Sequence, residues 1–353
     1  MATVTPMMQQ YLEIKEQYKD CILFFRLGDF YEMFFNDAEV ASRELEITLT
    51  GKDCGLDERA PMCGVPYHSA ESYISKLINK GYKVAICEQV EDPALAKGLV
   101  KREVIRVITP GTVIESSMLD EKKNNYLISI YKFKHYFSLA IVDISTGEFL
   151  STQITWGNTV NKLTDELAKF SPSEVIVNSE FMEDESLIAN IRKRFHFYMS
   201  KFDDSNFEYS FAANKIKKKF GQCEILKMDY SLSVNAAGAL LEYLEQTQKV
   251  NLDHIQSLNV YKVEEFMVLD AATRRNLELT ETMRERSRKG SLLWVLDKTM
   301  TSMGGRLLRK WIEQPLINIS AINERLDAVD EMKQKFIMRK EIRELLQRVY
   351  DIE

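Results

Sequence analysis

The chain has 353 residues, of which 45% are hydrophobic and 28% are charged, and its formal net charge is −6. This length exceeds one ordinary hydrophobic core and predicts two or three domains. No stretch approaches the roughly 20 uninterrupted apolar residues of a membrane span, and the N-terminus lacks the basic and apolar regions of a secretory signal. The sequence therefore predicts a cytoplasmic protein with no membrane partner.

The first 115 residues predict a mixed α/β domain. A Thr-Pro pair at residues 5–6 is typical of a helix start, and the compact apolar run 21–25 is typical of a buried strand. In chain order we expect a helix from residue 5, a strand at 21–25 that ends at 28–29, and then a helix to about 45. A short strand at 47–49, a polar loop at 51–59, an irregular segment at 60–68, a helix at 69–81, and strands at 82–88 and 104–109 follow.

A polar, charged segment at residues 116–125 is typical of a linker, and residues 126–245 predict a second α/β domain. Strands are expected at 126–131, 136–144 and 148–154, with a tight hairpin turn at 145–148, followed by a helix at 158–170 and a strand at 174–178. A three-stranded meander followed by α/β units predicts a ribonuclease-H-like layout.

Residues 246–353 belong to a region that predicts only helices. Amphipathic patterns occupy 236–249, 271–283, 292–313 and 322–349. The last pattern has no stop signal before the final residue, so we expect the chain to be cut inside a larger protein with an all-α domain.

Five cysteines are dispersed through the chain without a C-x-x-C pair, at positions 21, 54, 63, 87 and 223. Such a set is typical of reduced, buried thiols. Cys54, Cys63 and His68 have a spacing that fits no common zinc site, so we expect no metal.

Motifs for catalysis are also missing from the sequence. It contains no G-x-x-x-x-G-K-[ST], G-x-G-x-x-G, H-E-x-x-H or G-x-S-x-G, so the chain is not an obvious enzyme. Asp143 lies in an expected strand and suggests a ribonuclease-H-like nuclease, but such a site needs two or three further carboxylates around its metal ions. The alternative is that Asp143 bonds the turn at Ser145 and Thr146.

Phe30 and Glu32 follow the first apolar run and allow two interpretations. Asp29 and Glu32 have the spacing of a helix capping box, with Phe30 packed back on the strand. Alternatively, an exposed Phe30 enters the minor groove of DNA and unstacks a base step, which costs least at a mismatch. Glu32 would then share a hydrogen bond with the displaced base.

The charge of this first segment limits how it can bind DNA. Residues 1–115 hold 13 Lys and Arg against 18 Asp and Glu, a balance of −5. Such a domain should not bind DNA tightly alone, and its contacts must rest on local basic groups. The candidates are Arg26, Lys97, Lys101, Arg102 and Arg106.

Residues 27–34, Leu-Gly-Asp-Phe-Tyr-Glu-Met-Phe, resemble the mismatch-recognition segment of the bacterial MutS family, with Phe30 and Glu32 in matching places. Further segments resemble that family in the same order: 60–68, 84–89, 109–112, 269–279 and 292–306. The resemblance covers essentially the whole chain and favours the wedge interpretation of Phe30.

The resemblance implies a domain order and a larger protein. Residues 1–115 would be the mismatch-recognition domain, 116–125 a linker, 126–245 the connector domain, and 246–353 the first part of a helical core and lever domain. The family continues into a DNA clamp and an ATPase that also carries dimerisation. The full-length parent would therefore be a homodimer that uses ATP and Mg²⁺ at the nucleoid and contacts a MutL-type protein through the connector, whereas this chain would have no cofactor.

The resemblance also implies roles for individual residues. Phe30 would be the wedge and Glu32 the contact to a base in mismatched double-stranded DNA. Further residues would lie near the DNA: Arg26, Met62, Pro66, Tyr67, His68, Lys101 and Arg102. The alternatives are that Met62 fills the core and that Lys101 and Arg102 form a solvated turn. For the function, the alternatives are the nuclease built on Asp143 and a partner-docking fragment without DNA affinity of its own.

Overall fold

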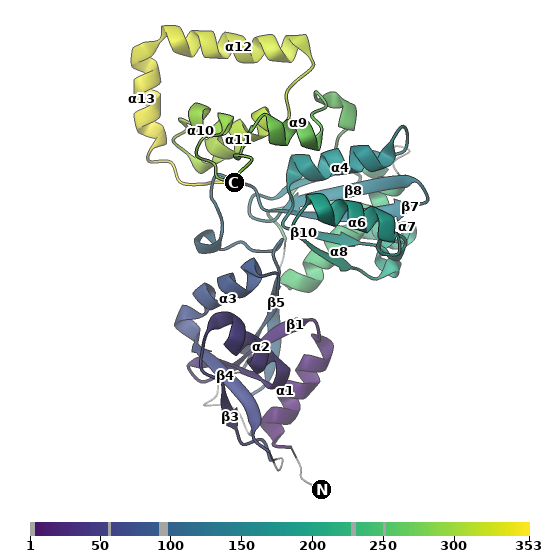
Figure 1. The fold of residues 1–353 in the computed structure, drawn as a ribbon, viewed down its shortest axis with the longest axis vertical. Coiled ribbons are helices and arrows are strands. Elements are labelled where there is room, and N and C mark those ends of the chain that lie inside the picture. The colour runs from purple at the N-terminus through teal and green to yellow at the C-terminus, as the bar shows by residue number, and fades with distance from the viewer. Residues whose placement is uncertain (1–3, 56–57, 92–97, 227–230, 250–251) are drawn as a thin grey trace. The chain divides into compact units, whose positions relative to one another are not determined.

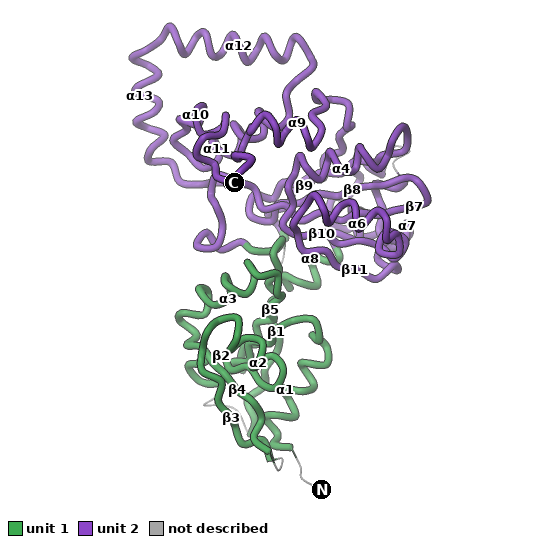
Figure 2. The backbone as a smooth tube through the Cα atoms, in the orientation of Figure 1, with its two compact units in different colours: residues 1–113, 242–252 green, residues 114–241, 253–353 purple. Residues whose placement is uncertain are grey.

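The computed structural model describes the chain except for residues 1–3, 56–57, 92–97, 227–230 and 250–251. The chain divides into two compact units, shown in Figure 2: residues 1–113 with 242–252, and residues 114–241 with 253–353. Within the described ranges, no helix combines the length and apolar character needed to cross a membrane.

The first unit is built on one mixed sheet of six strands, in the order β3-β4-β2-β1-β5-β6. Figure 1 labels β1, β3, β4 and β5 of this sheet together with three helices of the unit. Its strands are β1 (Cys21–Leu27), β2 (Phe30–Phe34), β3 (Thr50–Lys52), β4 (Ala60–Pro66), β5 (Lys83–Gln89) and β6 (Arg102–Ile108). Its helices are α1 (Pro6–Gln17), α2 (Phe35–Leu45) and α3 (Ala70–Asn79), the last preceded by a 3-10 turn η1 (Tyr67–Ser69).

The helix expected after residues 28–29 is wrong in its first part, because Phe30–Phe34 is the strand β2. It forms a hairpin with β1 in which Leu27 is opposite Phe30, and Gly28 takes the first turn position at φ +57°. A two-residue hairpin turn favours glycine there, and aromatic residues favour strands. The capping box is therefore wrong too: Glu32 lies inside a strand, and α2 begins only at Phe35, without a side-chain cap.

Two neighbouring expectations also need correction, and one is confirmed. The strand expected at 47–49 is wrong, and a short strand, β3, forms instead at Thr50–Lys52. The segment expected to be irregular is the strand β4, paired with both β2 and β3. Gly81 does end α3 as expected, with φ +84° and its amide donating to Ile78 O at 2.8 Å.

Helix α1 covers part of one face of this sheet. Its Tyr11 ring stands edge-on to Phe25 and Phe34, with ring centroids 5.4 and 5.0 Å away. On the opposite side of β4, the Cys63 thiol donates to Ala38 O of α2. Alternate residues of a strand share a face, so Phe30 and Glu32 project on the same side as buried Phe34, at the end that Tyr11 does not cover.

The second unit contains another mixed six-stranded sheet, ordered β11-β10-β7-β8-β9-β12. Its strands are β7 (Tyr126–Phe133), β8 (Tyr136–Asp143), β9 (Glu148–Ile154), β10 (Glu174–Val177), β11 (Tyr198–Lys201) and β12 (Asn259–Val260). The expected antiparallel meander is confirmed as β7, β8 and β9, and β10 pairs parallel to β7.

Helices cover both faces of this second sheet. One face packs on α4 (Thr159–Phe170), α5 (Ser179–Met182) and α6 (Glu185–Arg194). The other face is reached by α7 (Tyr209–Phe220) and α8 (Ser231–Gln248): the Phe220 ring lies against Phe149, and the Ser138 hydroxyl donates to Leu232 O at 2.5 Å. The expected α/β layers are thus present, and their ribonuclease-H-like name stays a prediction.

The helical region is more broken than its pattern predicts. It contains α9 (Ala271–Asn276), α10 (Leu292–Leu296), α11 (Ser302–Glu313), α12 (Ile319–Gln334) and α13 (Phe336–Leu346). The single helix expected at 292–313 is wrong because Asp297 accepts from the Thr299 amide at 2.9 Å and Thr301 caps α11 by accepting from Gly304 N at 3.1 Å. The helix expected at 322–349 is also two helices, and residues 347–353 are not helical.

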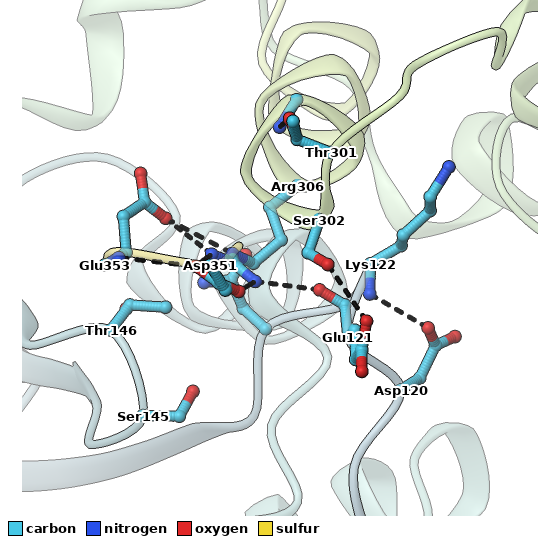
Figure 3. Close-up of polar contacts among 12 residues, drawn as sticks. Asp120, Glu121, Lys122, Ser145, Thr146, Thr301, Ser302, Arg306, Asp351 and Glu353 are labelled. Carbon is cyan, nitrogen blue, oxygen red and sulfur yellow. Dashed lines mark hydrogen bonds and ion pairs between the residues drawn. The ribbon is translucent and has the colours of Figure 1, made fainter. Parts of the chain in front are cut away.

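The segment expected to be a free linker is partly docked on α11. Figure 3 shows Arg306 donating to Glu121 O at 2.8 Å and to both carboxylate oxygens of Asp351, at 2.7 and 2.8 Å. A Cβ atom on Gly305 would lie 2.8 Å from the Lys122 side chain, so this glycine leaves room for Lys122. The Lys122 ammonium in turn donates to Thr299 Oγ1 at 3.1 Å.

Asp297 lies at the break between α10 and α11, and we expect its contacts with Thr299 and Lys122 to weaken in acid. Burial alone would raise the pKa of this carboxyl, but hydrogen bonds from Thr299 and the Lys122 ammonium lower it from 3.8 to about 2. A depressed carboxyl pKa stabilises the fold above the unfolded value, and this stabilisation is lost as the pH falls from about 4 toward 2. We expect Asp297→Asn to cost roughly 1–3 kcal/mol at pH 7 and progressively less below pH 4, measured by urea unfolding. A penalty that is equal at pH 7 and pH 3 would contradict this assignment.

Candidate nucleic-acid interface

The hairpin turn between β1 and β2 presents Phe30 at the end of the sheet face that α1 only partly covers. Phe30 is the first residue of β2, pairs with Leu27 on one side and with Pro66 on the other, and is 46% exposed. The Tyr67 amide also donates to Asp29 O at 2.9 Å, which ties the turn to the end of β4. A large aromatic ring is therefore held in solvent on a backbone paired along both edges.

Arg26 braces this turn. Its Nε donates to Gly28 O at 2.6 Å, and its Cζ lies 3.8 Å from the centroid of the Tyr67 ring. Its Nη1 also lies 3.7 Å from Glu88 Oε1. The structure thus brings Arg26 close to Phe30, as expected, but its guanidinium is engaged with the protein and positions the turn.

Glu32 lies two residues along β2 from Phe30 and is paired with a lysine that the sequence analysis did not single out. Lys52 Nζ lies 2.6 Å from Glu32 Oε2, and the two side chains are 33% and 18% exposed. Gly64 is opposite Glu32 on β4, where an added Cβ would lie 3.5 Å from Glu32 Cγ. Lys52 was missed because residues 51–59 were expected to be a loop, and only the register of β3 on β4 brings it here.

The candidates on β4 and η1 divide into two groups. Pro66 is opposite Phe30, and Tyr67 and His68 are exposed beside it, with their rings edge-to-face at 5.8 Å. Met62 is opposite Phe34 and packs partly buried against the core of the first unit. The structure therefore brings Pro66, Tyr67 and His68 together with Phe30, and favours the interpretation of Met62 as core filler.

The basic candidates also differ in their surroundings. Arg102 is buried, and its guanidinium donates to Arg26 O at 2.7 Å, to Val100 O at 2.8 Å and to Gln10 Oε1 at 3.1 Å. It therefore stabilises the sheet edge, and we leave it out of the phosphate contacts. Lys101 is exposed beside Glu103, whose carboxylate raises the pKa of this lysine.

Arg106, a further basic candidate, is bound within its own unit. The Arg106 guanidinium donates to Thr112 O at 3.1 Å, which attaches it to the Thr-Pro-Gly-Thr turn. Lys97 lies outside the described residues.

Asp143 does not have the surroundings of a nuclease metal ligand. It is fully buried, and its carboxylate accepts four hydrogen bonds: from Asn124 Nδ2, Asn125 N, Ser145 N and Ser145 Oγ, at 2.7, 3.2, 2.9 and 2.6 Å. The interpretation that it bonds the turn at Ser145 is confirmed. Across the described part of the chain, no three His, Cys, Asp or Glu side chains are grouped as they would be around a metal ion.

The five cysteines, all among the described residues, form no disulfide, as expected. Cys21, Cys54, Cys63 and Cys87 are buried and Cys223 is partly exposed. Burial raises the pKa of Cys21, Cys63 and Cys87 to about 12, so these thiols stay protonated at neutral pH.

Three family models match successive segments of the chain. Residues 5–117 match the family described as MutS domain I, residues 125–256 match MutS domain II, and residues 272–353 match MutS domain III. The residues that present Phe30 and Glu32 thus fall within the domain I match.

Curated relatives align along the whole chain. Proteins named DNA mismatch repair protein MutS from Acetivibrio thermocellus and Ruminiclostridium cellulolyticum are 72% and 68% identical over 353 residues. A third, from Alkaliphilus oremlandii, is 56% identical over 361 aligned positions. Each alignment covers 100% of this chain but only 41%, 40% and 41% of the relative, so the chain spans about two fifths of their length.

Proposed function

The chain belongs to the MutS family of DNA mismatch repair proteins, and we propose that it is the part of such a protein that reads mismatched or unpaired bases in duplex DNA. The observation that carries the proposal is Phe30, an aromatic side chain 46% exposed at the tip of a hairpin. A ring held away from its own core on a rigid backbone is suited to entering a base stack.

The proposed mechanism uses the deformability of DNA. Phe30 enters the minor groove and separates two stacked base pairs, which kinks the duplex. A mismatched step has lost pairing energy and costs less to open than a paired one, so the wedge selects deformable sites without reading a sequence. Glu32, on the same face of β2, then accepts a hydrogen bond from the displaced base.

The surroundings of Phe30 supply the remaining contacts in this proposal. Pro66, Tyr67 and His68 follow the groove beside the wedge, and Lys101 contacts phosphate. Because residues 1–115 have a balance of −5 (13 basic minus 18 acidic), these contacts are too few for tight binding. We expect the 353-residue chain by itself to bind DNA weakly and with strong salt dependence.

The remaining functions of the full-length protein are proposed from its family. ATP and Mg²⁺ bind, and dimerisation occurs, through residues outside this chain. The segment matching MutS domain II contacts a MutL-type protein. The protein works in the cytoplasm, at the nucleoid.

Comparing two duplexes that differ at one base pair tests the proposed function. Full-length protein should bind a duplex with one G·T mismatch at least tenfold more tightly than the paired duplex at the same salt concentration, because opening the mismatched step costs less. Fluorescence anisotropy measures both affinities. Equal affinities would contradict mismatch reading and leave partner docking as the role of this chain.

A further inference from the structure

The ion pair between Lys52 and Glu32 assigns a role to a residue outside the recognition segment. We propose that Lys52 is a positioning residue that stays bound to Glu32 when DNA binds, and leaves the other carboxylate oxygen to the displaced base. This inference rests on the proposed function of Glu32. It assigns to Lys52 the role of allowing the Glu32 carboxylate to approach DNA despite the nearby phosphate groups.

Within the described residues, Lys52 binds one of the two oxygens of the Glu32 carboxylate. Lys52 Nζ donates to Glu32 Oε2 at 2.6 Å, and among the contacts of the described residues Oε1 accepts no hydrogen bond. The ammonium also lies 5.5 Å from the centroid of the Phe34 ring, a cation–π distance. Glu32 and the Phe34 ring thus both hold the lysine head group, and Oε1 stays available.

The charge of Lys52 offsets a repulsion that Glu32 would otherwise experience. A carboxylate brought to the surface of a duplex is repelled by phosphates, and the first unit has no cationic excess to offset this. An ammonium 2.6 Å away makes the pair nearly neutral as seen by the phosphates. The other oxygen, Oε1, can then approach the base with less repulsion from the phosphates.

This arrangement also contributes to selectivity. A base in a normal pair already uses its Watson–Crick N–H groups, whereas a displaced base has an N–H donor without a partner. Oε1 can accept from a Watson–Crick N–H group only when its base is displaced, so this hydrogen bond is gained at a mismatch and not at a paired step. Lys52 therefore acts on mismatch affinity through Glu32, and not as an independent phosphate contact.

A double-mutant cycle in the full-length protein tests the inference on the G·T and paired duplexes. Lys52→Met keeps the stem of the side chain and removes the charge, and we expect it to weaken mismatch binding about tenfold, since a close charge pair is broken. In the Glu32→Gln background the same change should have at most about a twofold effect, because no carboxylate remains to compensate. Lys52→Arg should restore most of the affinity.

A matched control lies in the same unit. Lys80 Nζ is 3.0 Å from Glu44 Oε2, an ion pair between the end of α3 and α2, so Lys80→Met should leave both affinities unchanged. Thermal melting of every variant checks that it is folded. If Lys52→Met weakens binding by the same factor with and without Glu32→Gln, the inference is overturned. The proposed function fails separately, when Glu32→Gln and Phe30→Ala both leave the mismatch preference intact.

Discussion

Phe30→Ala is expected to remove most of the preference for mismatched DNA while leaving the fold intact. The ring is 46% exposed, so its removal opens no cavity in the core. Stacking of a base on an aromatic side chain contributes about 1–3 kcal/mol, which corresponds to roughly a 5- to 150-fold loss of mismatch affinity. Affinity for the paired duplex should change little, because there the wedge does not gain from insertion. Fluorescence anisotropy on both duplexes measures the two effects.

The chain contains a matched control for this substitution. Phe133 is 42% exposed and also flanks a two-residue hairpin, opposite Tyr136 at the end of β7 and β8. Phe133→Ala should leave both affinities unchanged. If Phe30→Ala and Phe133→Ala behave alike, exposure of an aromatic ring at a hairpin would not be the basis of mismatch reading.

Gly238→Ala is expected to destabilise the second unit, although alanine favours helices. Gly238 lies in α8, where a Cβ atom would come within 2.3 Å of the Cα and Cβ atoms of Ala212 in α7. The two helices must move apart to accommodate it, at a cost of about 2–3 kcal/mol. Helix propensity alone predicts the opposite sign, a gain of about 1 kcal/mol. Chemical denaturation followed by circular dichroism distinguishes the two.

Gly304 in α11 provides the comparison. Its nearest contacts for an added Cβ are Thr301 Oγ1 at 3.1 Å and Thr299 Cβ at 3.4 Å, both side-chain atoms. Gly304→Ala should therefore cost much less than Gly238→Ala. A stabilising effect at position 238 would show that α7 and α8 do not cross so closely.

The antiparallel meander of the second unit was predicted more accurately than the helices that follow residue 290. The meander of β7, β8 and β9 follows from alternating apolar runs and a turn at Ser145, all local signals. The breaks at Asp297 and at Lys335 interrupt amphipathic patterns that continue across them. Such a pattern reports which face is apolar, and it does not report where a capping side chain ends one helix and starts the next.

Residues 27–34, which contain Phe30 and Glu32, also show that a local pattern can predict the wrong conformation. Phe30 and Glu32 remain candidates, but the segment was predicted to be helical because an Asp-x-x-Glu spacing fits a helix start. The strand β2 forms because β1 and β4 pair with it on both edges. A two-residue turn separates β1 from β2, whereas α2 and β3 lie between β2 and β4 in the chain.

The sequence by itself determined the family, the order of its parts and the two residues, Phe30 and Glu32, on which the proposed function rests. These follow from residue identity along one continuous segment. Only the tertiary structure decided that Arg102 is buried, that Arg26 braces the turn and that Lys52 holds Glu32. Burial, strand register and ion pairing depend on residues far apart in the chain, so no local pattern carries them.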